Sequence, residues 1–165
     1  MEAYNPFAVF ARQGQLFCCH DRCRSTVPRR SFEDKAELQA AVAAWTASKS
    51  GVPPSNWDVA KVDDFSELFK DNTQFNEDIS GWNTEFVYTM ASMFEGATAF
   101  NQDISGWNTE ITSNMNRMFY GASAFNQDLC PWYQQLRNVD DMFVGTNCPN
   151  KNDPGVANYC FNCEN

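Results

Sequence analysis

Histidine is almost missing from this chain of 165 residues, and basic residues are scarce after position 50. His20 is the single histidine, and residues 51–165 hold 5 basic against 16 acidic side chains. Such an acidic excess repels phosphate backbones, which argues against nucleic acid as a partner. No apolar run approaches the roughly 18 residues of a membrane-spanning helix, so we expect no membrane span.

The sequence also lacks the residue sets that carry common enzyme chemistry. It contains no Ser/His/Asp combination in a recognisable motif, no phosphate-binding glycine loop and no glutamate pair in distinctive surroundings. We therefore expect a protein that is not an enzyme and that needs no cofactor.

Cysteine is absent between positions 24 and 129, and the seven cysteines lie near the two ends of the chain. We predict disulfides within the C-terminal group, whose spacing does not choose among the pairings of Cys130, Cys148, Cys160 and Cys163. A zinc site is the alternative, in which Cys160 and Cys163 share the metal with ligands among Cys18, Cys19, Cys23 and His20. The C-x-x-C spacing at 160–163 lacks the βαβ context of a thioredoxin-like site.

The cysteines bear on the compartment as well. Disulfides indicate an extracellular or cell-surface protein, whereas free thiols or zinc indicate an intracellular or organellar assembly subunit. The N-terminal residues have no basic segment and only a short apolar run, so they do not match a signal peptide. We expect an extracellular or cell-surface location, with the assembly subunit as the alternative.

A 25-residue repeat is the strongest feature that the sequence does have. The segment "FNEDISGWNTE" at 75–85 returns as "FNQDISGWNTE" at 100–110. Each of three column types recurs at this interval: Trp57, Trp82, Trp107 and Trp132; Phe75, Phe100 and Phe125; Asn76, Asn101 and Asn126. A fixed period of this length indicates a solenoid, in which each unit buries its apolar columns by stacking on the next.

The repeats predict an α/β solenoid with closed ends. Within a unit, "DISGW" predicts a short strand and the segment around "MASMFEGA" a short helical turn. A helix is predicted over 32–49, with Ser31 and Asp34 as a capping box and Gly51 as its terminator. We thus expect an irregular segment at 1–30, a capping helix and turn at 31–56, the repeats at 57–148 and a Cys-rich cap at 149–165.

The repeat motif W-N-T…M-x-x-M-F-x-G-A-x-x-F-N-Q-D-I-S-G resembles that of the BspA-type leucine-rich-repeat surface proteins, also described as the Mycoplasma-lipoprotein repeat family. The resemblance covers about 57–148 and extends to the preceding helix and the closing "GTNCPNKNDPG…C…C". It implies a small leucine-rich-repeat-like solenoid that is often surface-exposed and has no known enzymatic chemistry. Members of the family are thought of as interaction or adhesion modules, and the family defines no catalytic residues.

The columns have structural and functional interpretations. For the tryptophans we favour core packing over an exposed platform for sugars. The asparagine amides are expected to bond between neighbouring units. Asp78, Asp103 and Asp128 form a further column, in which each carboxylate caps its own turn while facing water. A calcium ion shared by these three carboxylates is the alternative, and they are the weak metal candidates of this chain.

These features predict a non-catalytic protein-interaction or adhesion module whose partner is another protein. Its specificity would lie at positions that differ from unit to unit, such as Lys70, Glu95 and Tyr120 in one column. One alternative is a structural or accessory subunit of a larger assembly, which docks through residues 1–30. Another is a surface module that binds a glycan or calcium.

Overall fold

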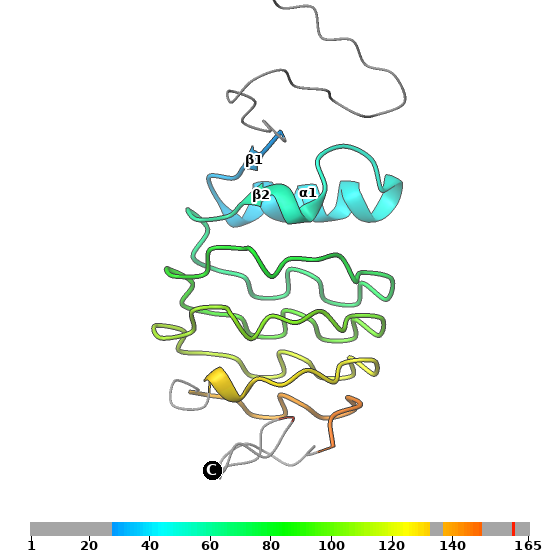
Figure 1. Ribbon diagram of the computed structural model, residues 1–165, viewed down its shortest axis with the longest axis vertical. Coiled ribbons are helices and arrows are strands. Elements are labelled where there is room, and N and C mark those ends of the chain that lie inside the picture. The colour runs from blue at the N-terminus through cyan, green and yellow to red at the C-terminus, as the bar shows by residue number, and fades with distance from the viewer. Residues whose placement is uncertain (1–27, 133–136, 150–159, 161–165) are drawn as a thin grey trace, which may run out of the picture.

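The computed structural model describes residues 28–132, 137–149 and 160. In these residues it has one α-helix, α1 (Lys35–Ser48), and two short strands, β1 (Arg30–Ser31) and β2 (Trp57–Asp58). Two 3₁₀ turns, η1 (Pro54–Asn56) and η2 (Cys130–Trp132), complete the regular elements. Figure 1 shows α1 at one end of a stack, through which the chain descends in sequence order.

The N-cap of helix α1 lies three residues after the predicted N-cap, Ser31. Asp34 is the N-cap, and its side chain accepts a hydrogen bond from the Glu37 backbone N–H at 2.9 Å. Glu37 reaches back to the Glu33 N–H at 3.0 Å, so the reciprocal cap is formed by an Asp and a Glu rather than by Ser31. Lys49, in the left-handed region with φ of 50°, ends the helix before Gly51.

Strand β1 pairs in parallel with β2, with Arg30 opposite Trp57 and Ser31 opposite Asp58. Arg30 is therefore part of the fold rather than of the irregular segment expected at 1–30, and Ser31 belongs to a strand rather than to the helix cap. The following Phe32 explains the pairing, because its ring is buried and lies edge-on against Trp57, with the ring centroids 5.2 Å apart. Burial of such a ring favours folding by about 2–3 kcal/mol and fixes the chain entering α1.

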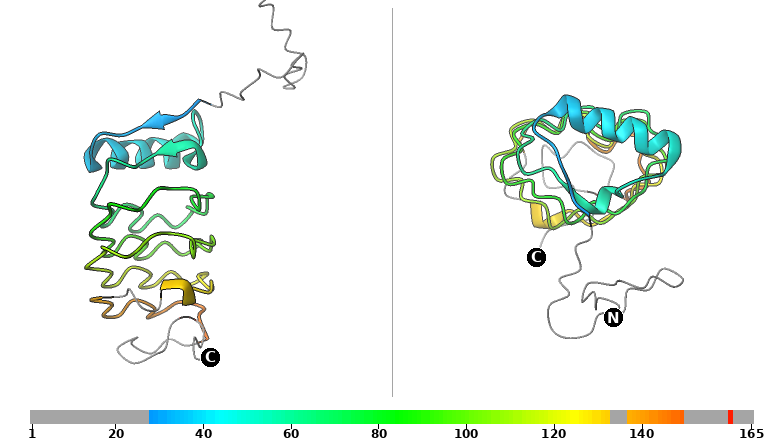
Figure 2. Two further views of the ribbon diagram at one scale, coloured as in Figure 1. Left: turned by 60° about the vertical axis from the view of Figure 1, so that its left-hand side comes forward. Right: turned by 90° about the horizontal axis from the view of Figure 1, so that it is seen from above.

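Successive 25-residue segments lie one above the other, and we call them coils. The first coil spans 57–81, the second 82–106 and the third 107–131, and the described residues of the last, shorter coil are Trp132 and 137–149. Isolated parallel bridges join Asp64 to Thr89 and Thr89 to Asn114, which are 25 residues apart. Seen from above, the coils share one outline and α1 runs along one side of it (Figure 2).

Turns take the place of the expected strand and helical turn within each coil. Neither "DISGW" at 78–82 nor "MASMFEGA" at 90–97 contains a strand or a helix. Backbone N–H groups in the second segment alternate between a local i→i+3 bond, such as Met93 to the Met90 carbonyl, and a bond to the next coil, such as Phe94 to the Met118 carbonyl at 2.8 Å. Since an α-helix needs every N–H within its own segment, this alternation excludes one.

The core fills the inside of the coils. Its residues come from the same positions of every coil, because a residue and its equivalent 25 positions later point inward together. Side chains of the phenylalanine and methionine columns are fully buried, as Phe69, Phe94, Phe119 and Phe143 illustrate with at most 1% exposure. Helix α1 adds Leu38, Ala41 and Val42 to this core and so covers the first coil.

Candidate interaction surface

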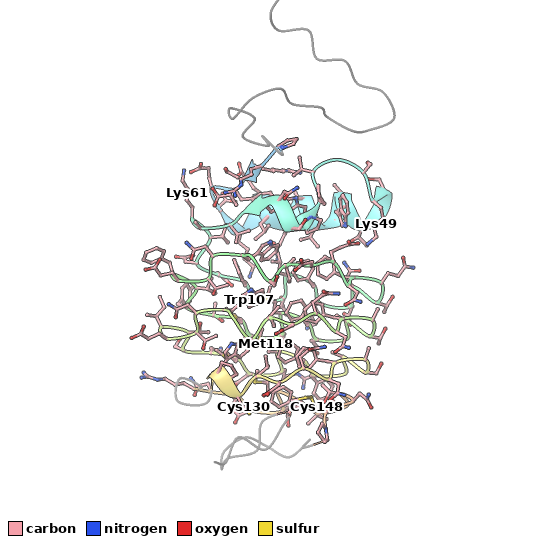
Figure 3. The ribbon with its side chains drawn as sticks, viewed as in Figure 1. Lys49, Lys61, Trp107, Met118, Cys130 and Cys148 are labelled. Carbon is pink, nitrogen blue, oxygen red and sulfur yellow. A yellow bond between two sulfur atoms is a disulfide. The ribbon has the colours of Figure 1, made fainter. Side chains whose placement is uncertain are left out.

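The tryptophan column lies inside the stack, where Figure 3 labels Trp107. Trp57, Trp82 and Trp107 are at most 5% exposed, and consecutive rings stack with centroids 6.2 and 6.3 Å apart. Each indole N–H donates to a carbonyl of an earlier segment, as Trp82 does to Pro54 at 2.9 Å. A buried, hydrogen-bonded column offers no flat exposed face to a sugar, so its place in the fold is structural.

Phenylalanines and asparagines form two adjoining columns. Phe75, Phe100 and Phe125 stack with centroids 6.1 and 6.0 Å apart. Asn76 accepts a hydrogen bond from the Asn101 backbone N–H at 2.9 Å, and the same bond recurs one coil further. The asparagine amides thus tie each coil to the next, and their accepting oxygens are already engaged.

The aspartate column faces water, and each carboxylate serves its own turn. Asp78 accepts from the backbone N–H and the hydroxyl of Ser80, at 3.0 and 2.7 Å, and the hydroxyl bond lowers the pKa of Asp78. Asp103 accepts from the Ser105 backbone N–H at 3.0 Å, which lowers the pKa of Asp103, and Asp128 accepts from the Cys130 N–H at 2.9 Å. In the described part of the chain, no three Asp, Glu, Cys or His side chains converge as metal ligands would.

Two of the proposed specificity positions are joined directly by an ion pair. The Glu95 carboxylate receives two hydrogen bonds from Arg117, at 2.9 and 3.2 Å, and lies 3.7 Å from the Lys70 ammonium. The Arg117 bonds hold the pKa of Glu95 down at about 2. The Arg117 guanidinium also stacks 4.0 Å from the centre of the Tyr120 ring. These side chains therefore contact one another across neighbouring coils.

Apolar side chains without such partners lie at another corner of the coils. Phe86 is 58% exposed, Ile111 is 51% exposed and Tyr88 is 47% exposed. We call these three residues the apolar corner. Monomeric proteins expose single apolar side chains routinely, but neighbouring ones on adjacent coils indicate a contact surface.

Local backbone geometry produces the apolar corner. Val87 and Thr112 point into the stack and are fully buried, and the Thr112 hydroxyl donates to the Val87 carbonyl at 2.8 Å. Phe86 lies in a turn in which the Val87 N–H donates to the Thr84 carbonyl at 3.0 Å, and Phe86 and Tyr88, on either side of the buried Val87 in the chain, are both exposed. The Ser113 N–H donates to the Tyr88 carbonyl at 2.9 Å, which holds the second and third coils together at this corner.

Acidic residues flank the apolar corner. Glu85 and Glu110 precede Phe86 and Ile111 in the chain and are exposed. The Asn83 side chain accepts from the Glu85 N–H at 3.0 Å, and Asn108 does the same for Glu110 at 2.9 Å, so the backbone turns in the same way at both glutamates. The surface therefore combines apolar anchors with negative charge.

The sequence analysis did not identify the apolar corner. The sequence feature that could have revealed it is the segment "EFVYT" at 85–89, where Phe86 and Tyr88 lie on both sides of the core residue Val87. The equivalent positions in the first coil hold Lys61 and Asp63, so the apolar character is confined to part of the column. Sequence comparison between coils finds repeated residues easily, and this surface is defined by residues that do not repeat.

Cysteines of the C-terminal group come together at the end of the stack opposite α1, where Figure 3 labels Cys130 and Cys148. Cys148 and Cys160 form a disulfide with their Cα atoms 4.7 Å apart, and both side chains are fully buried. Cys130 is disulfide-bonded as well. The other cysteine candidates, Cys163, Cys18, Cys19 and Cys23, and the zinc candidate His20 lie outside the described residues.

A groove runs between α1 and the first coil. Val42 and Leu68 form its floor, and Lys70, Asp71 and Gln74 line one wall. Asn72 crosses the groove with a 2.7 Å hydrogen bond from its amide nitrogen to the Thr46 hydroxyl. The groove is open to solvent and brings together no set of reactive side chains.

Comparisons with known proteins place most of the chain in one family. A family model described as "Mycoplasma protein of unknown function, DUF285" matches residues 30–155. No curated protein and no solved structure matches the chain. Across the described residues, no helix is long and apolar enough to span a membrane.

Proposed function

The chain belongs to this family, whose function is unknown, and we propose that it is a non-catalytic protein-interaction module of the BspA type. Its scaffold is a short leucine-rich-repeat-like solenoid capped by α1 and by the Cys-rich C-terminal segment. Backbone hydrogen bonds between successive coils, such as those of Phe65 to Thr89 and Met115 to Asn138, support this scaffold. The apolar corner is the observation that carries the proposed function.

The partner is a protein segment that combines an apolar anchor with basic residues. Phe86 and Ile111 offer apolar area on adjacent coils, and aromatic residues of this kind are enriched among interface hot spots. The neighbouring Glu85 and Glu110, within a strongly acidic body, favour positive charge on the partner. A glycan or a nucleic acid would not bind more tightly through both the apolar area and the negative charge.

The location proposed for this module is the cell surface or the space outside the cell. The disulfide between Cys148 and Cys160 supports it, because structural disulfides persist in oxidising compartments. A thiol titration of the natively purified protein tests the location. Free Cys148 and Cys160 thiols would argue for a reducing compartment and for the assembly-subunit alternative.

A peptide-display selection on the immobilised full-length chain tests the proposed interaction. We expect selected peptides that carry Lys or Arg beside an aromatic or aliphatic residue, with binding that weakens as salt is raised. Phe86→Ser with Ile111→Ser should abolish this binding. Val144→Ser is the matched control, since Val144 is also exposed, at 39%, but lies elsewhere on the last coil.

Two results would contradict the proposal. One is a set of selected peptides without basic residues, which would remove the role of the acidic flank. The other is unchanged binding in the Phe86→Ser, Ile111→Ser variant, which would place the binding surface elsewhere. Because both side chains are mostly exposed, this variant should retain the stability of the wild type to within about 1 kcal/mol.

A further inference from the structure

The apolar corner and its acidic flank have no counterpart within the part of the chain that the structure describes. The three side chains of the corner are 47 to 58% exposed. Glu85 and Glu110 are exposed as well, and neither forms an ion pair with another described residue. An occupant of this surface therefore needs both apolar and basic side chains.

The first coil interrupts this surface on the side of α1. Lys61 takes the place there that Phe86 has in the second coil, and its ammonium lies 2.6 Å from the Glu33 carboxylate. Figure 3 labels Lys61 at the α1 end of the stack. The chain that leads into α1 thus contacts the column of the apolar corner, one coil before the corner begins.

Residues 1–27, which we call the arm, precede this contact and lie outside the described residues. Their sequence has the chemistry that the apolar corner requires. The segment "PFAVFARQGQLF" at 6–17 combines three phenylalanines with Arg12. Residues 1–30 hold 5 basic and 2 acidic side chains, whereas residues 51–165 hold 5 and 16. The opposite charges attract the arm to the stack.

The arm joins the stack close to the apolar corner. It leads into β1, in which Arg30 lies opposite Trp57. Phe86 is the equivalent of Lys61, four residues after Trp57, and lies one coil further. With 3.3 Å per residue and nearly 5 Å between coils, this separation is roughly 20 Å. The 20 residues from Phe10 to Arg30 span about 66 Å when extended, so the phenylalanines of the arm can reach the corner.

An occupant of this corner is held by its side chains rather than by backbone pairing. The Tyr88 N–H donates to the Asp63 carbonyl and the Ser113 N–H to the Tyr88 carbonyl, both at 2.9 Å. The Ser113 carbonyl accepts from the Asn138 side chain at 2.6 Å. The backbone groups of Tyr88 and Ser113 are therefore engaged between coils and offer no edge to an added strand.

We propose that the arm binds the apolar corner of its own chain, and that an external partner has to displace it. The phenylalanines of the arm supply the apolar contact, and Arg12 pairs with the flanking glutamates. This inference rests on the proposed function, since it identifies an internal competitor for the same surface. Attachment through the chain gives the arm an effective concentration of about 1 mM at the corner. If the arm alone binds with a Kd of about 0.1 mM, it weakens the binding of a partner roughly tenfold.

Isoleucine methyl NMR of the full-length protein tests this contact. The chain has three isoleucines, and one of them, Ile111, lies in the apolar corner. Ile79 and Ile104 are fully buried in the stack, so their signals report on the fold of the coils. A change confined to Ile111 therefore reports binding at the corner.

Phe7→Ser with Phe10→Ser removes two aromatic rings of the arm. We expect this variant to shift the Ile111 methyl signal, because the rings no longer lie against it, and to leave the two buried isoleucines unchanged. Gln13→Ser with Gln15→Ser is the matched control in the same segment and should change none of the three signals. Added salt should move the wild-type Ile111 signal toward that of the Phe7→Ser, Phe10→Ser variant.

The peptides selected by display on the full-length chain measure the competition. They should bind the Phe7→Ser, Phe10→Ser variant about tenfold more tightly than the wild type. Arg12→Gln should show part of this gain, and its Ile111 signal should depend less on salt.

Three results would overturn the proposal. The first is an Ile111 signal that is the same in the wild type and the Phe7→Ser, Phe10→Ser variant. The second is a difference that grows with protein concentration, because the occupant would then be the arm of a second copy. The third is a difference that extends to Ile79 and Ile104, because the arm would then belong to the stack itself.

Failure of this inference is distinguishable from failure of the proposed function. Selected peptides that shift Ile111, together with arm substitutions that do not, would leave the proposed function in place and remove the arm as occupant. Selected peptides that leave Ile111 unchanged even in the Phe7→Ser, Phe10→Ser variant would contradict the proposed function. The arm contact would then be judged by the Ile111 difference between the variant and the wild type alone.

Discussion

Replacement of Trp82 by alanine tests whether the coils are held together by their inward columns. The Trp82 ring is 4% exposed and lies between the rings of Trp57 and Trp107, 6.2 and 6.3 Å away. Truncation of a buried tryptophan costs about 3–5 kcal/mol. It also leaves the Pro54 carbonyl, which accepts from the indole at 2.9 Å, without its donor. The total free energy of unfolding of a folded protein is about 5–15 kcal/mol, so this loss is a large part of it.

We therefore expect Trp82→Ala to lower the melting temperature by about 10 °C and to shift the urea midpoint accordingly. Trp82→Phe keeps a ring in the column and loses the N–H donor, so it should cost about 1–2 kcal/mol. Phe86→Ala is the matched control in the same coil, because a ring that is 58% exposed should contribute within about 0.5 kcal/mol.

The position of Trp82 between two coils makes a second outcome measurable. Each coil contacts only its neighbours, so damage in the second coil weakens its contacts on both sides. Amides of the first and third coils should then exchange faster together. Equal unfolding free energies for Trp82→Ala and Phe86→Ala would refute the argument, since burial would then not determine the contribution of a ring.

Three further substitutions address other parts of the stack. Glu95→Gln should lower the free energy of unfolding by about 1 kcal/mol at neutral pH. Because Arg117 lowers the pKa of Glu95 from 4.5 to about 2 in the folded state, this loss is present above pH 4.5 and vanishes as the pH falls toward 2. Urea titrations at several pH values measure it. Gly96→Ala should lower the free energy of unfolding by about 1–3 kcal/mol in thermal melting, because φ is +70° and the new Cβ meets a side chain of the first coil. Gly106→Ala, with open space around the new Cβ, should be neutral or slightly stabilising. Cys160→Ser opens a disulfide that spans 12 residues and should cost about 2–3 kcal/mol in the same measurement; an unchanged melting temperature would show that this bond does not stabilise the last coil.

The period of the stack follows from the sequence, but the backbone conformation within a coil does not. Identical residues 25 positions apart must occupy equivalent places, so the tryptophan and phenylalanine columns could be predicted to lie together. The turns depend on left-handed residues in one column, namely Glu67, Ser92, Arg117 and Asp141, with φ between 55° and 59°. None of these is glycine, so no residue type announces the conformation. The bonds to neighbouring coils hold it in place.

The N-terminal end shows the same division between pattern and context. The apolar face of α1 and a cap of the capping-box type were visible in the sequence. The choice of Asp34 over Ser31 was not, because Ser31 belongs to β1, whose pairing with β2 depends on Phe32 packing against Trp57. The contact between Phe32 and Trp57, which are 25 positions apart, thus determines where helix α1 begins.

Variation between coils is a poor guide to binding unless the partners of each side chain are known. Lys70, Glu95 and Tyr120 differ along one column, yet the Arg117 side chain and the Lys70 ammonium neutralise Glu95, and Arg117 covers Tyr120. Phe86 and Ile111 also belong to a varying column, whose first member is Lys61, but they are more than half exposed. Substitution at the apolar corner leaves the inward columns intact, so the proposed binding surface can vary while the coils keep their fold. We therefore propose that exposed apolar area without an internal partner, rather than sequence variation itself, marks a binding position in this stack.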